Sequence, residues 1–194
     1  MVLPGIAETR IWRFASILSH GSNFRASQSL IGTAETNNLT IQQSKSHHMQ
    51  LHLKTAVAQD YMQVFNAFDE QLFRKLSPPY PRLRLLRFDG SRPGDVVEVE
   101  LQTGIKSFRW TSLITDRSIT GTEAYFIDQG QELPPPLKVW HHKHLVTKND
   151  SGAIIHDIIT YSTGFKPVDV LLYPLMLLQF GMRKPVYRRV FGKV

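Results

Sequence analysis

Residues 168–182 constrain the fold most, because their spacing predicts a helix that is apolar on more than one side. Apolar side chains occupy one stripe of this helix and also positions well off it, namely Leu171, Leu175, Leu178 and Met182 on the stripe and Val170, Tyr173 and Leu177 off it. A sheet can cover one side, whereas the other side needs a partner, a membrane surface or a ligand-filled cavity. The apolar run, residues 168–180, is shorter than the roughly 20 residues that cross a bilayer and is interrupted by Pro174 and Gln179, so no transmembrane helix is predicted.

The chain before this helix predicts one helical region among many strands. Apolar residues at helical spacing over residues 59–76, followed by Pro78 and Pro79, indicate one bent helix or two short ones. Alternating or turn-bounded apolar segments predict strands at residues 49–54, 82–89, 96–101, 107–116, 123–128, 137–147 and 153–161. Residues 149–152 predict a hairpin turn between the last two strands. This order is typical of an α+β fold in which the sheet wraps around the final helix.

Residues 1–48 differ from the rest of the chain. Ser, Thr, Asn and Gln are frequent there, and neither helical nor strand periodicity persists. We therefore predict a disordered N-terminal extension over residues 1–48 and one folded domain over residues 49–194. A targeting segment is the less favoured alternative, because Glu8 and Glu35 are unusual in transit peptides.

Composition limits the environment and the partners. The chain has no cysteine, which excludes disulfides and thiolate metal sites and leads us to expect a cytoplasmic location. A net charge of +7 predicts attraction to anionic surfaces. Five cations lie in the tail, residues 183–193, around Tyr187 and Phe191. We expect this tail to be a solvated basic face at the helix end, with transient contact to an anionic membrane as an alternative and no nucleic-acid partner.

Four segments together resemble the ligand-binding SRPBCC branch of the START-like superfamily, which is related in fold to the birch-pollen allergens and the polyketide cyclases. The resemblance covers roughly residues 49–191, and its segments are Leu76-Ser77-Pro78-Pro79, Arg87-Phe88-Asp89-Gly90 with residues 94–98 after it, Trp140-His141-His142-Lys143-His144, and Asp157-Ile158-Ile159-Thr160-Tyr161. The resemblance implies a helix-grip fold, in which a curved antiparallel sheet wraps around a long C-terminal helix. It also implies a pocket for a hydrophobic or amphipathic small molecule.

The histidine-rich segment holds the main candidates for chemistry. Three imidazoles within four positions could bind a metal or move protons. On a strand, His142 and His144 share one face and His141 points away. A turn at residues 149–152 places Asp157 on the face of His142 and His144, for a two-residue or a four-residue loop alike. A structural His–Asp pair is the favoured interpretation, and pocket-lining polar groups or an acid–base site stay open. No carboxylate or cysteine at a supporting spacing indicates a metal, so we predict none.

The predicted function is binding of a small hydrophobic or amphipathic ligand, without catalysis and without a cofactor, in a cavity between the sheet and the final helix. The predicted lining residues are Phe65, Phe68, Trp110, Tyr125, Trp140, His142, Tyr161, Leu171, Leu175 and Leu178. One alternative is an enzyme of the cyclase, dehydratase or hydrolase type acting on an aromatic or polyketide-like substrate, with His142 or His144 as the base and Asp157 orienting it. The other is an interaction module whose apolar helix docks on another protein.

Overall fold

Seven strands form one antiparallel sheet in residues 48–194, the part of the chain that the computed structural model describes. The strands are β1 (Met49–Val57), β2 (Arg82–Phe88), β3 (Val96–Gln102), β4 (Ser107–Ile119), β5 (Glu123–Glu132), β6 (Val139–Asn149) and β7 (Gly152–Ser162). Their order across the sheet is β1-β7-β6-β5-β4-β3-β2. The chain therefore crosses from one edge of the sheet to the other after β1 and returns strand by strand to lie beside β1 again.

Two short helices make the crossing, α1 (Tyr61–Asn66) and α2 (Glu70–Leu76). Asp60 caps α1 by accepting a hydrogen bond from the Met62 backbone N–H at 2.9 Å, and Asp69 caps α2 by accepting one from Leu72 at 2.8 Å. The second cap explains why one apolar pattern gives two helices, as the sequence allows: Asp69 begins a new helix within the pattern.

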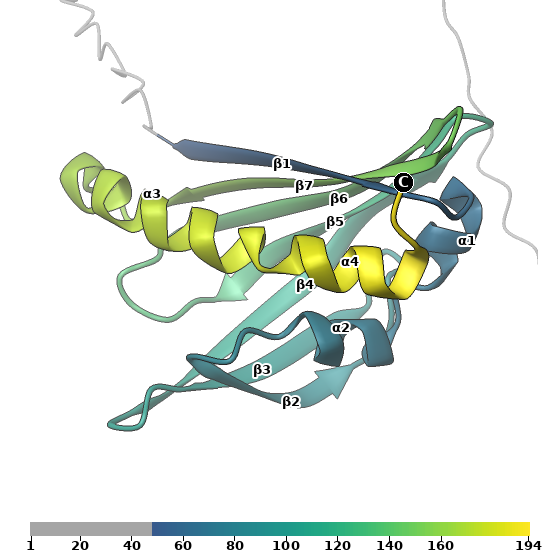
Figure 1. The fold of residues 1–194 in the computed structure, drawn as a ribbon. Coiled ribbons are helices and arrows are strands. Elements are labelled where there is room, and N and C mark those ends of the chain that lie inside the picture. The colour runs from purple at the N-terminus through teal and green to yellow at the C-terminus, as the bar shows by residue number, and fades with distance from the viewer. Residues whose placement is uncertain (1–47) are drawn as a thin grey trace, which may run out of the picture. The chain divides into compact units, whose positions relative to one another are not determined.

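The C-terminal helices α3 (Lys166–Gly181) and α4 (Arg183–Phe191) run across the concave face of the curved sheet (Figure 1). The start of α3 is fixed to the end of β7. The buried Asp169 side chain accepts a hydrogen bond from the Thr163 backbone N–H at 2.6 Å, and the Tyr161 hydroxyl donates to the Asp169 carbonyl oxygen at 2.7 Å. The predicted α+β architecture, with a curved antiparallel sheet around a long C-terminal helical segment, is confirmed.

The core has two clusters along these helices. One lies under α3 and joins Leu51, Trp140 and Ile159 of the sheet to Met176 and Phe180. The other lies under α4 and joins Val57, Val64, Leu72, Phe126, Val146, Tyr187 and Phe191, among others. Each helix therefore packs its own part of the sheet.

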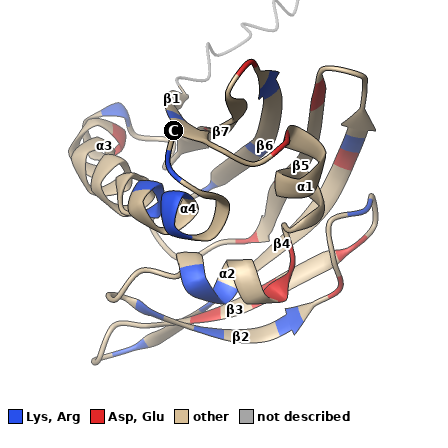
Figure 2. Cartoon of the chain, turned by 45° about the vertical axis from the view of Figure 1, so that its right-hand side comes forward, with Lys and Arg blue, Asp and Glu red and all other residues tan. Residues whose placement is uncertain are grey.

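Helix α4 corrects the expectation for the tail. Its Tyr187 and Phe191 side chains are 0% and 1% exposed, so the segment forms part of the core and is more than a solvated basic end. Arg188 and Arg189 remain exposed, and Figure 2 shows cations gathered on α4. The aromatic residues recur every fourth position, which places them on one side of a helix.

The β6–β7 hairpin sets the register of the candidate site. Asn149 pairs with Gly152 across a two-residue loop, and His144 then lies opposite Asp157. Gly152 has a φ of +139°, and a side chain there would collide with the backbone of Val57. The predicted turn and the predicted common face of His142, His144 and Asp157 are thus confirmed.

Two expectations concern regions outside this sheet. The predicted disordered extension, residues 1–48, lies outside the described residues except for His48, so the domain boundary at Met49 stays a prediction. Among the helices of residues 48–194, none is long and apolar enough to cross a membrane.

Replacing Phe191 with Ala should lower the free energy of unfolding by about 3 to 5 kcal/mol, because the ring is buried between α4 and the sheet. Urea denaturation followed by tryptophan fluorescence measures the change. The matched control is Arg188→Ala on the exposed side of the same helix, with an expected change within about 0.5 kcal/mol. Equal losses in the two variants would contradict the placement of α4 in the core.

Candidate functional site

A cavity of about 170 Å³ lies between the concave face of β2 to β6 and the helices α2, α3 and α4. Most of its wall is apolar and includes Leu72, Val99, Leu101, Ile114, Phe126 and Met176. At one place the lining changes character, because Ser112, Asp128, His142, His144 and Arg183 contribute polar groups. The cavity therefore combines apolar walls with one polar end.

Four of the predicted lining residues contact this cavity, namely Phe68, Trp110, Trp140 and His142. His144 lines it as well. The Phe68 ring meets the His144 ring edge-on, with centroids 5.6 Å apart, and the two tryptophans meet edge-on at 4.7 Å. The aromatic side chains thus surround the polar end of the cavity.

Three other predicted residues lie elsewhere. Phe65 is buried in the core cluster under α4, and Tyr161 is buried under α3, where it holds Asp169. Tyr125 points to the outer face of β5, where its hydroxyl donates to Asp116 at 2.9 Å. Strand alternation explains this last correction, because Phe126 takes the inward position next to it.

The leucine stripe of α3 is the largest correction. Leu171, Leu175 and Leu178 are 74%, 52% and 63% exposed and lie outside the cavity lining. The inward side of α3 is instead formed by Asp169, Leu172, Tyr173, Met176 and Phe180. Because both sides of this helix are apolar, the sequence pattern does not say which side faces the sheet.

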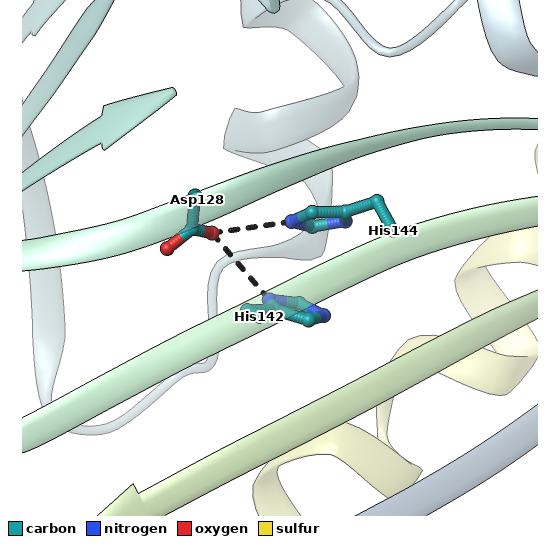
Figure 3. Close-up of side chains that lie close together, drawn as sticks. All are labelled: Asp128, His142 and His144. Atoms are coloured by element: carbon teal, nitrogen blue, oxygen red, sulfur yellow. Dashed lines mark hydrogen bonds and ion pairs between the residues drawn. The ribbon is translucent and has the colours of Figure 1, made fainter. Parts of the chain in front are cut away.

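Asp128 of β5 organises the polar end (Figure 3). Its Oδ1 accepts hydrogen bonds from Trp140 Nε1 at 2.9 Å and from the Ser112 hydroxyl at 3.1 Å. Its Oδ2 lies 3.2 Å from His144 Nε2 and 3.6 Å from His142 Nδ1. One carboxylate therefore connects three strands of the sheet.

Asp157 of β7 binds the other side of His142. Its Oδ1 lies 3.0 Å from His142 Nε2, and it also accepts longer contacts from Arg183 Nη1 at 3.4 Å and from the Tyr187 hydroxyl at 3.5 Å. The register of β6 and β7 places Asp157 opposite His144, yet the hydrogen bond runs diagonally to His142. His142 thus lies between the buried carboxylate of Asp157 and the partly buried carboxylate of Asp128.

The protonation states follow from these contacts. Burial disfavours the cation of His142, but hydrogen bonds and charge from Asp128 and Asp157 outweigh burial and raise its pKa. Burial and the neighbouring His142 lower the pKa of His144 to about 4. Burial opposes ionisation of Asp157, but His142 and Arg183 lower its pKa to about 2. At neutral pH the polar end therefore has the neutral imidazole of His144 beside the Asp128 carboxylate and the Arg183 guanidinium, while Asp128 and the Asp157 carboxylate behind it favour the protonated form of His142.

A neutral His144 must donate its Nε2 hydrogen to Asp128, because an ionised carboxylate only accepts. Its Nδ1 then carries a lone pair, and this atom is buried without a hydrogen-bond partner among the described residues. The His144 ring is stacked on Phe126, with centroids 4.3 Å apart, and it contacts the tilted His142 ring, with centroids 3.7 Å apart. Ring contacts with both neighbours hold His144 in place beside the cavity.

Sequence reasoning missed Asp128, Ser112 and Arg183. A signal for Asp128 exists in the pairing of β5 with β6, where Asp128 lies directly opposite His142. The six-residue connection between these strands, residues 133–138, does not fix that register in advance. Arg183 lies in the tail, for which the sequence predicts a solvated end, so no sequence signal indicates its contact with Asp157.

Solved structures with the same architecture are known at low sequence identity. The aromatase/cyclase Zhui from Streptomyces sp. R1128 matches with a TM-score of 0.51 and 13% identity, over 76% of this chain and 100% of that one. The di-domain ARO/CYC StfQ from the steffimycin biosynthetic pathway matches at 0.52 and 12%, over 75% of this chain and 50% of that one. Norcoclaurine synthase from Thalictrum flavum, in complex with dopamine and hydroxybenzaldehyde, matches at 0.50 and 16%, over 82% and 96%.

These likenesses show the fold, and the helix-grip fold implied by the sequence resemblance is confirmed. Neither a family model nor a curated protein matches the sequence.

Replacing Asp157 with Ala should lower the free energy of unfolding by about 3 to 5 kcal/mol, because the buried His142 and the partly buried Arg183 both lose a buried counter-ion. The loss should be greatest between about pH 4 and 6.5. Below that window the contribution of Asp157 disappears as the pH falls towards its folded pKa of about 2. Above the window the contribution of His142, whose pKa is raised, disappears as the pH rises through its folded pKa.

Chemical denaturation at a series of pH values measures this profile. Glu132→Ala, at the exposed end of β5, is the control for loss of a carboxylate and should show neither the loss nor its pH dependence. A pH-independent loss in Asp157→Ala would contradict the charge pairing.

Proposed function

We propose that the protein binds a small amphipathic molecule, with an aromatic or other apolar body and at least one oxygen substituent, and that it does so without catalysis. The observation that carries this proposal is the cavity itself, whose walls are mostly apolar and whose polar end is built from buried and partly buried titratable groups. Removal of the apolar body from water supplies the affinity, and the polar end orients the ligand.

The size of the cavity favours a compact ligand. A cavity of about 150 Å³ is enough for a benzene ring in a protein interior, and this one measures about 170 Å³. Trp110, Trp140 and Phe68 offer ring faces and edges to an aromatic body. A single ring with short substituents therefore suits the cavity better than a long acyl chain does.

Arg183 supports an oxygen substituent on the ligand. Within the described residues its side chain makes one hydrogen bond, to Asp157, although a guanidinium has five N–H donors. Its guanidinium also lies over the Phe180 ring at 4.2 Å, which holds the group at the edge of the cavity. A carbonyl, phenolic or carboxylate oxygen can accept from the remaining donors.

The structural neighbours add support of a general kind. Two of them are named as aromatase/cyclases, and norcoclaurine synthase was solved with dopamine and hydroxybenzaldehyde, which are oxygenated aromatic compounds. Such ligands agree in size and polarity with the cavity of this chain.

An enzyme of the cyclase, dehydratase or hydrolase type is the second candidate. It is favoured by the adjacent His142 and His144 rings, which lie beside the cavity and contact Asp157 and Asp128. Imidazoles in such positions can move protons to and from a bound substrate. Non-catalytic binding is preferred, because both carboxylates already serve as counter-ions for groups inside the protein.

Transient contact with an anionic membrane forms a separate part of the proposal. Exposed apolar side chains gather along α3 and its two ends, namely Phe165, Val170, Leu171, Leu175, Leu177, Leu178 and Met182. The exposed cations Arg188 and Arg189 follow on α4. An apolar face next to cations is typical of helices that lie on anionic bilayers, where an amphipathic ligand would be taken up. A cytoplasmic location, expected from the sequence, is compatible with such contact.

Native mass spectrometry with organic extraction of the purified full-length protein should reveal a bound small molecule, and added hydroxylated aromatic compounds should quench the fluorescence of Trp110 and Trp140. Val99→Phe fills part of the cavity and should weaken binding at least about tenfold. Leu171→Phe adds a ring on the exposed side of α3 and should leave the affinity unchanged.

Equal affinity in the two variants would contradict binding in the cavity. The enzyme would be favoured over the binding protein if the wild-type protein chemically converts an added compound and His144→Ala does not. The His144→Ala variant must then show the circular dichroism spectrum of the folded wild-type protein.

Co-sedimentation with phosphatidylserine-containing vesicles tests the membrane contact. Replacing Leu171, Leu175 and Leu178 with Ser should reduce the bound fraction several-fold, and added salt should reduce it further because the cations of α4 contribute. Ile105→Ser, which removes a 93% exposed isoleucine from the β3–β4 turn, is the control. Unchanged sedimentation of the triple variant would contradict the membrane assignment. A wild-type dimer that becomes monomeric in the triple variant would contradict it as well.

A further inference from the structure

Three metal-ligating groups converge at the polar end of the cavity. Asp128 Oδ2 lies 3.2 Å from His144 Nε2 and 3.6 Å from His142 Nδ1, and one donor atom from each residue lies within 4.8 Å of the others. Figure 3 shows both imidazole nitrogens turned towards the same carboxylate oxygen. The donor atoms therefore surround one point in space.

The backbone produces this convergence. His142 and His144 are separated by one residue on β6, so strand alternation turns both imidazoles to the concave face. Asp128 lies directly opposite His142 on β5, which turns its carboxylate to the same face. The site thus rests on two paired strands in the middle of the sheet, where donor positions are held more firmly than on a loop.

The separations of Asp128 Oδ2 from the two imidazole nitrogens are compatible with a shared metal ion. Charge-assisted N–H···O bonds usually measure about 2.7 to 2.9 Å, and both contacts of Asp128 Oδ2 are longer. Ligands bound to one ion at about 2.0 to 2.1 Å lie roughly 3 to 3.4 Å apart. Small side-chain shifts are then enough to bring all three donors to an ion.

A second layer of contacts orients two of the three groups. His142 Nε2, the nitrogen facing away from the convergence point, is held by Asp157 at 3.0 Å. Asp128 Oδ1 accepts hydrogen bonds from Trp140 and Ser112, which leaves Oδ2 for the convergence point. Carboxylate–histidine pairs of this kind are the usual outer contacts of protein metal sites, where they fix the ligating nitrogen and increase its basicity.

The donor set and the surroundings indicate the class of ion. Two imidazoles and one carboxylate suit Zn²⁺ or Fe²⁺, and three protein ligands leave coordination positions open. Asp128, His142 and His144 all line the cavity, so the open positions face it. An ion there would meet a ligand in the cavity.

We propose that Asp128, His142 and His144 form a binding site for a divalent transition-metal ion, Zn²⁺ or Fe²⁺, at the polar end of the cavity. The site stands on the three side chains and their outer contacts and does not depend on the identity of the cavity ligand. Asp157 acts as a positioning residue, because it reaches the ion only through His142.

Isothermal titration of the untagged, metal-free full-length protein with Zn²⁺ tests the proposal, and the visible absorption of added Co²⁺ reports the coordination. We expect one ion per chain at this site. His144→Ala should weaken its affinity at least about 100-fold, and Asp157→Asn should weaken it about 10- to 100-fold. His52→Ala is the matched control, because His52 and His156 form another close pair, 2.9 Å apart, away from the cavity lining.

A measurement on the wild-type protein covers the case in which a variant fails to fold. In imidazole-nitrogen NMR spectra, one equivalent of Zn²⁺ should shift the signals of His142 Nδ1 and His144 Nε2 and leave those of His52 and His156 unchanged. The proposal is overturned by a folded wild-type protein that binds no ion at one equivalent, by His144→Ala with wild-type affinity, or by shifts confined to His52 and His156.

Discussion

Two carboxylates inside the sheet must be neutralised, and the arrangement of the surrounding elements follows from that requirement. A buried charge without a partner is far more costly than any single packing defect. Asp157 of β7 meets this requirement with His142 of β6 and Arg183 of α4, and Asp128 of β5 meets it with histidines of β6 and donors from β4 and β6. The charge pairs thus help to fix the register of four strands and the position of the last helix on the sheet.

The same charges explain why a cavity remains beneath the helices. Met176 and Phe180 of α3, together with Tyr187 and Phe191 of α4, pack on the sheet on either side of the polar groups. An apolar side chain packed over Asp128, His142 and His144 would prevent these groups from contacting a polar partner in the cavity. The space beside these groups therefore suits a ligand that carries a polar group. Helix α2 and the strands β2 and β3 form the apolar wall of the cavity.

Much of this structure can be predicted from the sequence, and the limits have physical causes. The order of elements, the two-residue hairpin and the common face of His142, His144 and Asp157 follow from strand alternation and turn chemistry. The position of Asp128 depends on a pairing across a longer connection, whose register no short-range rule fixes. The orientation of α3 depends on a choice between two apolar sides, and the spacing of the leucines alone does not show that they face away from the sheet. Tyr125 and Phe126 present a similar choice on β5, because either aromatic could face inward.

Stability alone does not account for the polar end. Replacing a buried network of ion pairs with well-packed apolar residues usually leaves a protein as stable or makes it more stable. Two carboxylates, a guanidinium and two imidazoles beside a cavity are therefore best explained by what they do for a bound species. An ion at the three donors would take the place of the hydrogens on His142 Nδ1 and His144 Nε2, the latter moving to His144 Nδ1, while His142 Nε2 keeps its hydrogen bond to Asp157. Arg183 would still offer its donors to an oxygen atom of the ligand, so the ion and the guanidinium can hold the same ligand from two sides.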